Sequence, residues 1–162
     1  MKNKSVALII VVFVLLVIIT LLIINNKQKI KKIEGIRIFT FSYSTGRAID
    51  SNVQYKLECT DKCIINIKPK GHLDEKIQVK EVNLDFVKQL EELLNNYQVF
   101  KWNGFKKYDK NVLDGNSFHL YIRLESEKTI EADGYMRYPH NYKIVRDKID
   151  KLFMSYWEDK NE

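Results

Sequence analysis

The sequence lacks the short motifs that mark the common classes of enzyme. It contains no G-x-S-x-G, no H-E-x-x-H and no phosphate-binding loop, the arrangements that place a nucleophile, a catalytic zinc ion or a nucleotide. Its three histidines, His72, His119 and His140, stand in no catalytic spacing. Carboxylates are plentiful, but no spacing singles out one of them as a general acid or base. We therefore expect a non-catalytic protein, with a small enzyme as the weaker alternative.

Cysteine is also scarce, with only Cys59 and Cys63 in the chain. A pair spaced C-x3-C with no histidine nearby does not make a closed zinc site, so the sequence predicts neither a metal nor a cofactor. The two cysteines face each other in the hairpin described below, and cross-strand neighbours can satisfy disulfide geometry. They are a candidate structural disulfide, which would require an oxidising compartment, with a buried pair of thiols as the alternative.

One long stretch lacks charge entirely. Val6 to Ile24 are 19 uncharged residues, of which 17 are Val, Ile, Leu or Phe. A helix of that length spans roughly 28 Å, close to the thickness of the hydrocarbon core of a bilayer. The run is longer than the apolar region of a signal peptide and is followed by no small-x-small cleavage site. We therefore predict a short N-terminal tail (1–4), an uncleaved transmembrane helix (5–24) and a single-pass membrane protein.

Acidic residues are absent from the first 32 positions, which hold six lysines and account for the net charge of +6. The remaining chain has 21 basic and 21 acidic residues. A neutral domain has no basic excess for non-specific binding of nucleic acid, so we expect no nucleic-acid partner.

The same lysines bear on the orientation of the domain in the membrane. Two precede the apolar run and four follow it, which favours a cytoplasmic domain. A single N-terminal anchor commonly exports the domain after it, and long domains are translocated largely regardless of their charge. We therefore expect an extracytoplasmic domain, against the lysine count.

Residues 25–35 form a lysine- and asparagine-rich tether, and residues 36–162 are long enough for one domain with its own core. Alternating apolar residues predict six strands, and apolar residues at helical spacing predict two helices. The first helix follows a candidate N-cap at Asn83, and the last has Pro139 at its first position. The predicted order is β-β-β-β-α-β-β-α, an α+β fold in which helices cover one face of an antiparallel-rich sheet.

The clearest local feature is a hairpin with a three-residue turn at 60–62. Apolar side chains that face one another across the two strands fix its register. The predicted pairs are Cys59 with Cys63, Leu57 with Ile65, and Tyr55 with Ile67.

The segment 99–117 shows neither helical nor strand periodicity, and a loop of that length is usually functional or ordered by its own side chains. It interleaves lysines with aromatic residues, a mixture suited to anionic or glycan ligands, and a second aromatic cluster lies at 135–142. The candidate ligand-binding residues are Lys101, Trp102, Phe105, Lys106, Tyr108, Tyr135, Arg137 and Tyr138. In the structural alternative, the loop aromatics pack under the sheet while the lysines stay in water, and the second cluster packs the final helix onto the sheet.

Several short motifs resemble those of a known bacterial family. They are Trp102-Asn103-Gly104-Phe105, Val112-Leu113-Asp114-Gly115 with Ser117-Phe118, Gly134-Tyr135 with Pro139 and Asn141-Tyr142, and the stretch Ser42–Gly46. Over about residues 40–155, this combination resembles a domain of membrane-anchored proteins and lipoproteins from clostridia-like Gram-positive bacteria. The resemblance implies a domain that faces the cell envelope and implies no activity. This chain departs from the lipoproteins in having an apolar helix instead of a lipidated cysteine, and its two cysteines are additional to the pattern.

The sequence therefore predicts a membrane-anchored, extracytoplasmic, non-catalytic domain that binds a cell-envelope polymer, another envelope ligand or a partner protein. Two alternatives stay open: a subunit of a membrane protein complex with a cytoplasmic domain, and a small envelope enzyme. An enzyme would need a concave site in which a carboxylate or histidine of perturbed pKa lies beside a nucleophile.

Overall fold

The computed structural model describes residues 12–17, 30–46, 52–71 and 77–157 of the chain. The chain divides into two compact units, residues 1–31 and 32–162. Of the predicted transmembrane segment (5–24), only residues 12–17 are described, and they are helical; the rest of that segment and half of the tether lie outside the described residues. Within the ranges given above, no helix has both the length and the apolar composition needed to cross a membrane.

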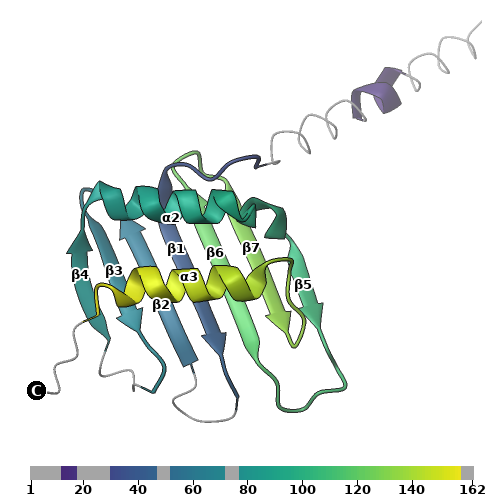
Figure 1. The fold of residues 1–162 in the computed structure, drawn as a ribbon. Helices are drawn as coiled ribbons and strands as arrows, with labels where there is room; N and C mark the ends of the chain where they lie inside the picture. Colours follow the sequence, from purple (N-terminus) through teal and green to yellow (C-terminus); the bar gives the residue numbers. More distant parts are fainter. Residues whose placement is uncertain (1–11, 18–29, 47–51, 72–76, 158–162) are drawn as a thin grey trace, which may run out of the picture. The chain divides into compact units, whose positions relative to one another are not determined.

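In the described part of the second unit, seven strands form one sheet in the order β4-β3-β2-β1-β6-β7-β5 (Figure 1). The strands are β1 (Ile36–Ser44), β2 (Asn52–Cys59), β3 (Cys63–Lys68), β4 (Gln78–Val82), β5 (Phe105–Tyr108), β6 (Ser117–Leu124) and β7 (Thr129–Tyr135). All neighbours pair antiparallel except β5 and β7, which are parallel. The unit is therefore a small α+β domain with a mostly antiparallel sheet, as predicted.

The central strands alternate buried and exposed side chains, because one face of the sheet is covered and the other is not. In β6, Phe118 and Leu120 are at most 3 % exposed, while His119 between them is exposed. The predicted hairpin register is confirmed, with Cys59 opposite Cys63 beside its turn. A shift by one residue would turn every apolar side chain of a strand to the open face, which is why this register is well determined.

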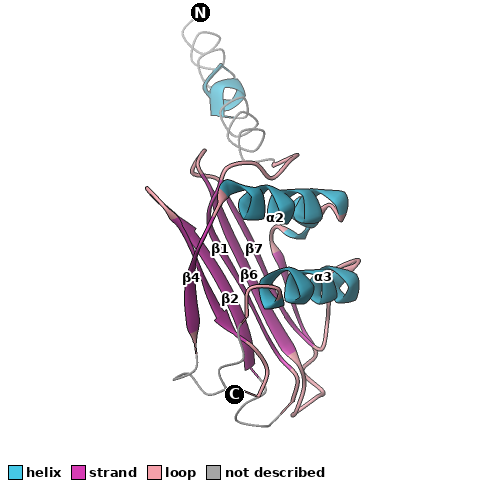
Figure 2. Ribbon diagram, turned by 60° about the vertical axis from the view of Figure 1, so that its left-hand side comes forward, coloured by secondary structure: helices cyan, strands magenta, loops and turns pink. Residues whose placement is uncertain are grey.

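Two helices, α2 (Leu84–Asn96) and α3 (Tyr142–Met154), lie on the same face of the sheet (Figure 2). The predicted N-cap of α2 is confirmed: the Phe86 N–H donates a hydrogen bond to the side-chain oxygen of Asn83 at 3.1 Å.

The start of α3 differs from the prediction. The helix begins at Tyr142, whereas the sequence places its first position at Pro139. Asn141 has a φ of 63°, in the left-handed region, so a right-handed helix cannot continue through it towards Pro139.

The core lies between the sheet and the two helices, and Phe153 of α3 joins its parts. The Phe153 ring stacks on Phe39 of β1 and Tyr55 of β2, with centroids 5.8 Å and 4.8 Å away. It meets Phe86 of α2 edge-on at 5.1 Å. All four side chains are at most 2 % exposed. Because such aromatic pairs stabilise beyond simple burial, they hold both helices in place over the sheet.

The predicted order of elements is wrong in one segment. Residues 99–117, expected to lack regular structure, contain the 3-10 helix η2 (Val99–Trp102) and the strand β5. β5 has four residues and pairs with β7, which is distant in sequence, so local periodicity cannot reveal it. As an edge strand it also keeps Lys106 and Lys107 exposed, which removes the usual apolar alternation.

The chain enters the second unit along α2. The Ile33 N–H donates to Asn95 Oδ1 at 2.8 Å, and Asn95 Nδ2 donates to the Ile33 carbonyl at 2.7 Å. Three residues later in the chain, the Ile36 N–H donates to Glu91 Oε1 at 3.0 Å. Ile33 is completely buried. These contacts of Asn95 and Glu91 with Ile33 and Ile36, here called the entry clamp, fix the start of β1 to α2.

Candidate functional site

The face of the sheet opposite the helices carries mostly polar side chains. Both helices lie on the other side of the sheet (Figure 2), and among the described residues no element covers this face. Its side chains come from alternate positions of the paired strands, including Thr40, Ser42, Ser44, Gln54, Lys56, Asn66, Lys68, His119, Tyr121, Arg123, Glu131 and Asp133. A polar face of this extent is accessible to a ligand or a partner.

An open groove with a volume of about 580 Å³ crosses this face. Its polar lining includes Ser42 and Ser44 of β1, Gln54 of β2, His119 of β6, Asp133 of β7 and Tyr108 of β5. The groove exists because the sheet order places β1 between β2, which follows it directly in the chain, and β6, which is far from it along the chain.

Three lining side chains form a row across β1, β6 and β7. The register places Ser42 opposite His119 and His119 opposite Asp133. His119 Nδ1 and Asp133 Oδ1 are 2.7 Å apart, at hydrogen-bond distance. This bond orients the imidazole ring, whose other nitrogen makes no hydrogen bond with the described residues.

Hydroxyl groups form the next row of the groove. Ser44 Oγ and Ser117 Oγ are 3.0 Å apart, and the Ser117 N–H donates to Ser44 Oγ at 3.1 Å. Tyr108 lines the groove from β5 and is 58 % exposed. The groove therefore combines hydroxyl groups with one accessible aromatic ring.

The lining carries opposite charges that nearly balance. Asp133 and Lys68 supply one charge of each sign, and His119 is hydrogen-bonded to Asp133. Asn52 and Gln54 add neutral amides, each of which can donate and accept hydrogen bonds. Such a lining has no strong overall preference for ions of either sign.

The row Ser42, His119 and Asp133 contains the residue types of a serine hydrolase triad. In the described chain no hydrogen bond joins Ser42 to His119, so the contact between nucleophile and base that defines such a triad is missing from this structure. Nor do the described residues include a group of three or more His, Cys, Asp or Glu side chains placed to hold a metal ion. The hydroxyl, amide, imidazole and carboxylate groups of the lining can donate or accept hydrogen bonds.

Two of the predicted ligand-binding aromatic residues, Trp102 and Phe105, pack inward. Trp102 is 3 % exposed, its Nε1–H donates to the His140 carbonyl at 3.1 Å, and its ring packs against Phe118 and Tyr142. Phe105 is half-buried and also contacts Phe118. These positions correspond to the structural alternative for the segment.

The predicted cationic residues do not converge on one site. Lys101 is exposed on η2. Lys106 and its neighbour Lys107 occupy successive positions of β5, so their side chains project to opposite faces. Arg137 forms an ion pair with Asp109 at 3.0 Å.

The second aromatic cluster packs the start of α3 onto the sheet. The Tyr138 ring stacks on Tyr142 with centroids 4.5 Å apart, and Tyr142 packs on Phe118 at 4.7 Å. The Tyr135 hydroxyl accepts a hydrogen bond from the Gly115 N–H at 2.6 Å.

Of the eight predicted ligand-binding residues, only Tyr108 lines the groove. Sequence reasoning misses Ser42, Gln54 and Asp133. The only signal for them in the sequence is that they are polar residues at alternate positions of a strand. Every strand with one covered and one open face has such residues, so the signal does not single these out. The order of strands in the sheet brings them together, and that order is not readable from local patterns.

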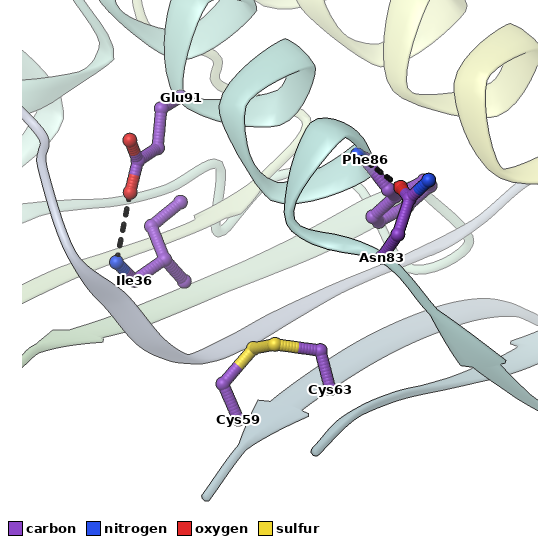
Figure 3. The surroundings of a disulfide bond; sticks show 6 residues. All are labelled: Ile36, Cys59, Cys63, Asn83, Phe86 and Glu91. Atoms are coloured by element: carbon purple, nitrogen blue, oxygen red, sulfur yellow. Dashed lines mark hydrogen bonds between the residues drawn. A yellow bond between two sulfur atoms is a disulfide. The ribbon is translucent and has the colours of Figure 1, made fainter. Parts of the chain in front are cut away.

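Cys59 and Cys63 are joined in a disulfide beside the β2–β3 turn (Figure 3), with Cα atoms 4.1 Å apart. Cys63 is 8 % exposed, and Cys59 is more accessible. The bond lies near the first turns of α2, where Figure 3 also shows the hydrogen bond between Glu91 and Ile36 of the entry clamp.

A second group of ionisable side chains lies between α3 and the sheet. The Tyr43 hydroxyl donates to Asp150 Oδ2 at 2.7 Å. Burial raises the pKa of the Asp150 carboxyl, although the hydrogen bond from Tyr43 and the Arg146 guanidinium both favour its ionised form. Burial also raises the pKa of the Tyr142 hydroxyl. These shifts follow from packing in the core and point to no reaction.

No protein-family model matches the sequence, and no curated protein is significantly similar to it. The resemblance to the clostridial envelope domain therefore stays a prediction. The function proposed below rests on the sequence and geometry of this chain.

Proposed function

We propose that the protein is a single-pass membrane protein whose extracytoplasmic domain, residues 36–162, binds a cell-envelope ligand without catalysing a reaction. The groove across the uncovered face of the sheet is the observation that carries the proposal. It gathers residues from six strands around one open concavity. Its nearest approach to a catalytic set, Ser42 with His119 and Asp133, lacks the hydrogen bond that would activate the hydroxyl.

Two features support the location. The apolar run from Val6 to Ile24 has the length and composition of a membrane anchor. The disulfide between Cys59 and Cys63 favours the outside of the cell, because cytosolic thiols are kept reduced. The resemblance to envelope domains agrees with both. The four lysines that follow the apolar run oppose this orientation.

Single-cysteine labelling tests the orientation. Leu113 is 93 % exposed, so Leu113→Cys in a chain with Cys59 and Cys63 replaced by serine presents one accessible thiol. Its matched control is Lys2→Cys in the same background, on the other side of the apolar run. Loss of the disulfide can weaken the fold, but it does not move a domain across the membrane.

We expect a membrane-impermeant maleimide to label the Leu113→Cys protein in intact cells and the Lys2→Cys protein only after lysis. The reverse pattern would place the domain in the cytoplasm and overturn the proposal.

Binding is tested separately by co-sedimentation of the detergent-solubilised, full-length chain with isolated Gram-positive cell walls. We expect Gln54→Ala to reduce the bound fraction and Lys56→Ala to leave it unchanged. Gln54 lines the groove, whereas Lys56 lies two residues further along the same strand and outside the lining. Equal sedimentation of both variants would show that the groove is not the binding site.

A further inference from the structure

The charges around the groove do not suit a polyanion. Lys106 of β5 lies opposite Asp133, and His119 is hydrogen-bonded to the same carboxylate. Lys107 projects to the other face of β5, where its Nζ lies 5.5 Å from the centroid of the Phe105 ring. A polyanion would need cations gathered on one surface, and Asp133 would repel it.

Hydrogen-bonding groups instead recur at the spacing of the strands. Gln54, Ser42, His119 and Asp133 occupy one row on four adjacent strands, so a polar group appears about every 4.8 Å. The serine hydroxyl and the amide both donate and accept, whereas the carboxylate only accepts. A ligand that displaces water from this row must therefore present both donors and acceptors along its length. Sugar hydroxyls do so at every ring.

Tyr108 supplies the apolar part of such a site. Its ring is 58 % exposed at the β5 end of the groove. The face of an aromatic ring carries partial negative charge, and the C–H face of a pyranose ring is weakly positive, so the two surfaces are complementary. Exposed tyrosine beside hydroxyl and amide groups thus matches a ligand with alternating apolar and hydroxyl-bearing surfaces.

We propose that the groove binds a neutral saccharide chain of the cell wall. The chain lies along the row from Gln54 to Asp133, with one sugar ring against Tyr108. This inference rests on the proposed extracytoplasmic function and names the ligand class of the same groove.

The test uses the full-length chain in nanodiscs and isothermal titration calorimetry with three probes. They are chitohexaose, wall glycan strands freed of peptide and of phosphate polymers with their lactyl carboxyl groups converted to neutral methyl amides, and poly(glycerol phosphate). We expect at least one neutral glycan to bind, with an affinity that changes little between low and high salt, because no ion pairs form. Poly(glycerol phosphate) should not bind.

Two pairs of variants locate the site. Gln54→Ala and Tyr108→Ala should each weaken glycan binding roughly threefold to tenfold, the effect of losing one neutral contact. Their controls, Lys56→Ala and Lys107→Ala, lie on the same strands outside the lining and should bind as the wild type does.

Each other outcome overturns the proposal in a recognisable way. Binding of poly(glycerol phosphate) alone, with a steep salt dependence, would leave an envelope-binding protein but refute the neutral saccharide. Binding of no probe, with the Leu113→Cys thiol labelled from outside, would refute the saccharide and leave the location intact. Labelling of Leu113→Cys only after lysis would refute the proposed function itself. Shortening of chitohexaose that disappears in Ser42→Ala would make the groove an active site.

Discussion

Replacing Asn95 with alanine tests the entry clamp, where the chain joins the folded domain. The substitution removes two hydrogen bonds to Ile33, of 2.8 Å to its N–H and 2.7 Å to its carbonyl. Each such bond contributes about 0.5–1.5 kcal/mol, so their loss costs about 1–3 kcal/mol. Ile33 is completely buried, and water cannot replace the amide unless the segment opens. Alanine also favours the helix by as much as about 0.7 kcal/mol, which offsets part of this loss.

Asn96 provides the matched control. It is the next residue of α2 and is exposed, so Asn96→Ala makes the same change of helix propensity without touching Ile33. The difference in the free energy of unfolding between the two variants therefore measures the contribution of the hydrogen bonds between Asn95 and Ile33. We expect Asn95→Ala to be less stable than Asn96→Ala by about 1–3 kcal/mol.

The measurement is urea denaturation, followed by circular dichroism, of a fragment that begins at residue 26. This fragment omits the apolar run and contains the whole compact unit 32–162. Hydrogen exchange at the Ile33 and Ile36 amides adds a local readout, because the clamp can open without global unfolding. Equal free energies of unfolding in the two variants, together with unchanged exchange at Ile33, would refute the clamp.

The remaining predictions concern the core, pH and the disulfide. Phe153→Ala should lower the free energy of unfolding, measured by urea denaturation, by about 3–5 kcal/mol. The neighbouring Met154 is 37 % exposed, so Met154→Ala should lower it far less. Equal decreases in the two variants would contradict the packing described for Phe153. Because the folded pKa of Asp150 is raised, its neutral form is the stabilising one, so the wild type should lose stability relative to Asp150→Asn as pH rises from about 4 through that pKa. Urea titrations at several pH values measure this, and a constant difference would show that Asp150 is not perturbed. Reduction of the Cys59–Cys63 disulfide, which closes a short loop of sequence separation 4, should cost on the order of 2 kcal/mol, and the double serine variant should not respond to reductant.

The elements that could be predicted from sequence are those whose determinants are local. The hairpin register follows from Leu57, Ile65 and their neighbours, because the side chains that pair across the turn are all apolar. The cap at Asn83 is equally local, since its partner is three residues away.

The features that could not be predicted depend on distant partners. β5 exists because Phe105 to Tyr108 reach the free edge of β7, and four residues are too few to show a period. The sequence does not show whether Trp102 is exposed or buried. Trp102 is buried because its ring packs against Phe118 and Tyr142, which are distant in sequence. The predicted start of α3 at Pro139 fails because Asn141 adopts a left-handed backbone conformation. Asparagine tolerates that conformation but does not require it, so the sequence does not reveal it.

The entry clamp and the groove lie at opposite ends of β1. The clamp holds Ile36 at the start of the strand, and Ser42 and Ser44 line the groove near its end. Six to eight residues of extended strand separate them by roughly 20–27 Å. Sites more than about 10 Å apart that share no partner are expected to act independently. Asn95→Ala should therefore lower stability but leave glycan affinity unchanged under conditions in which the domain is folded. A weaker affinity in that variant would show that β1 transmits the state of the clamp to the groove.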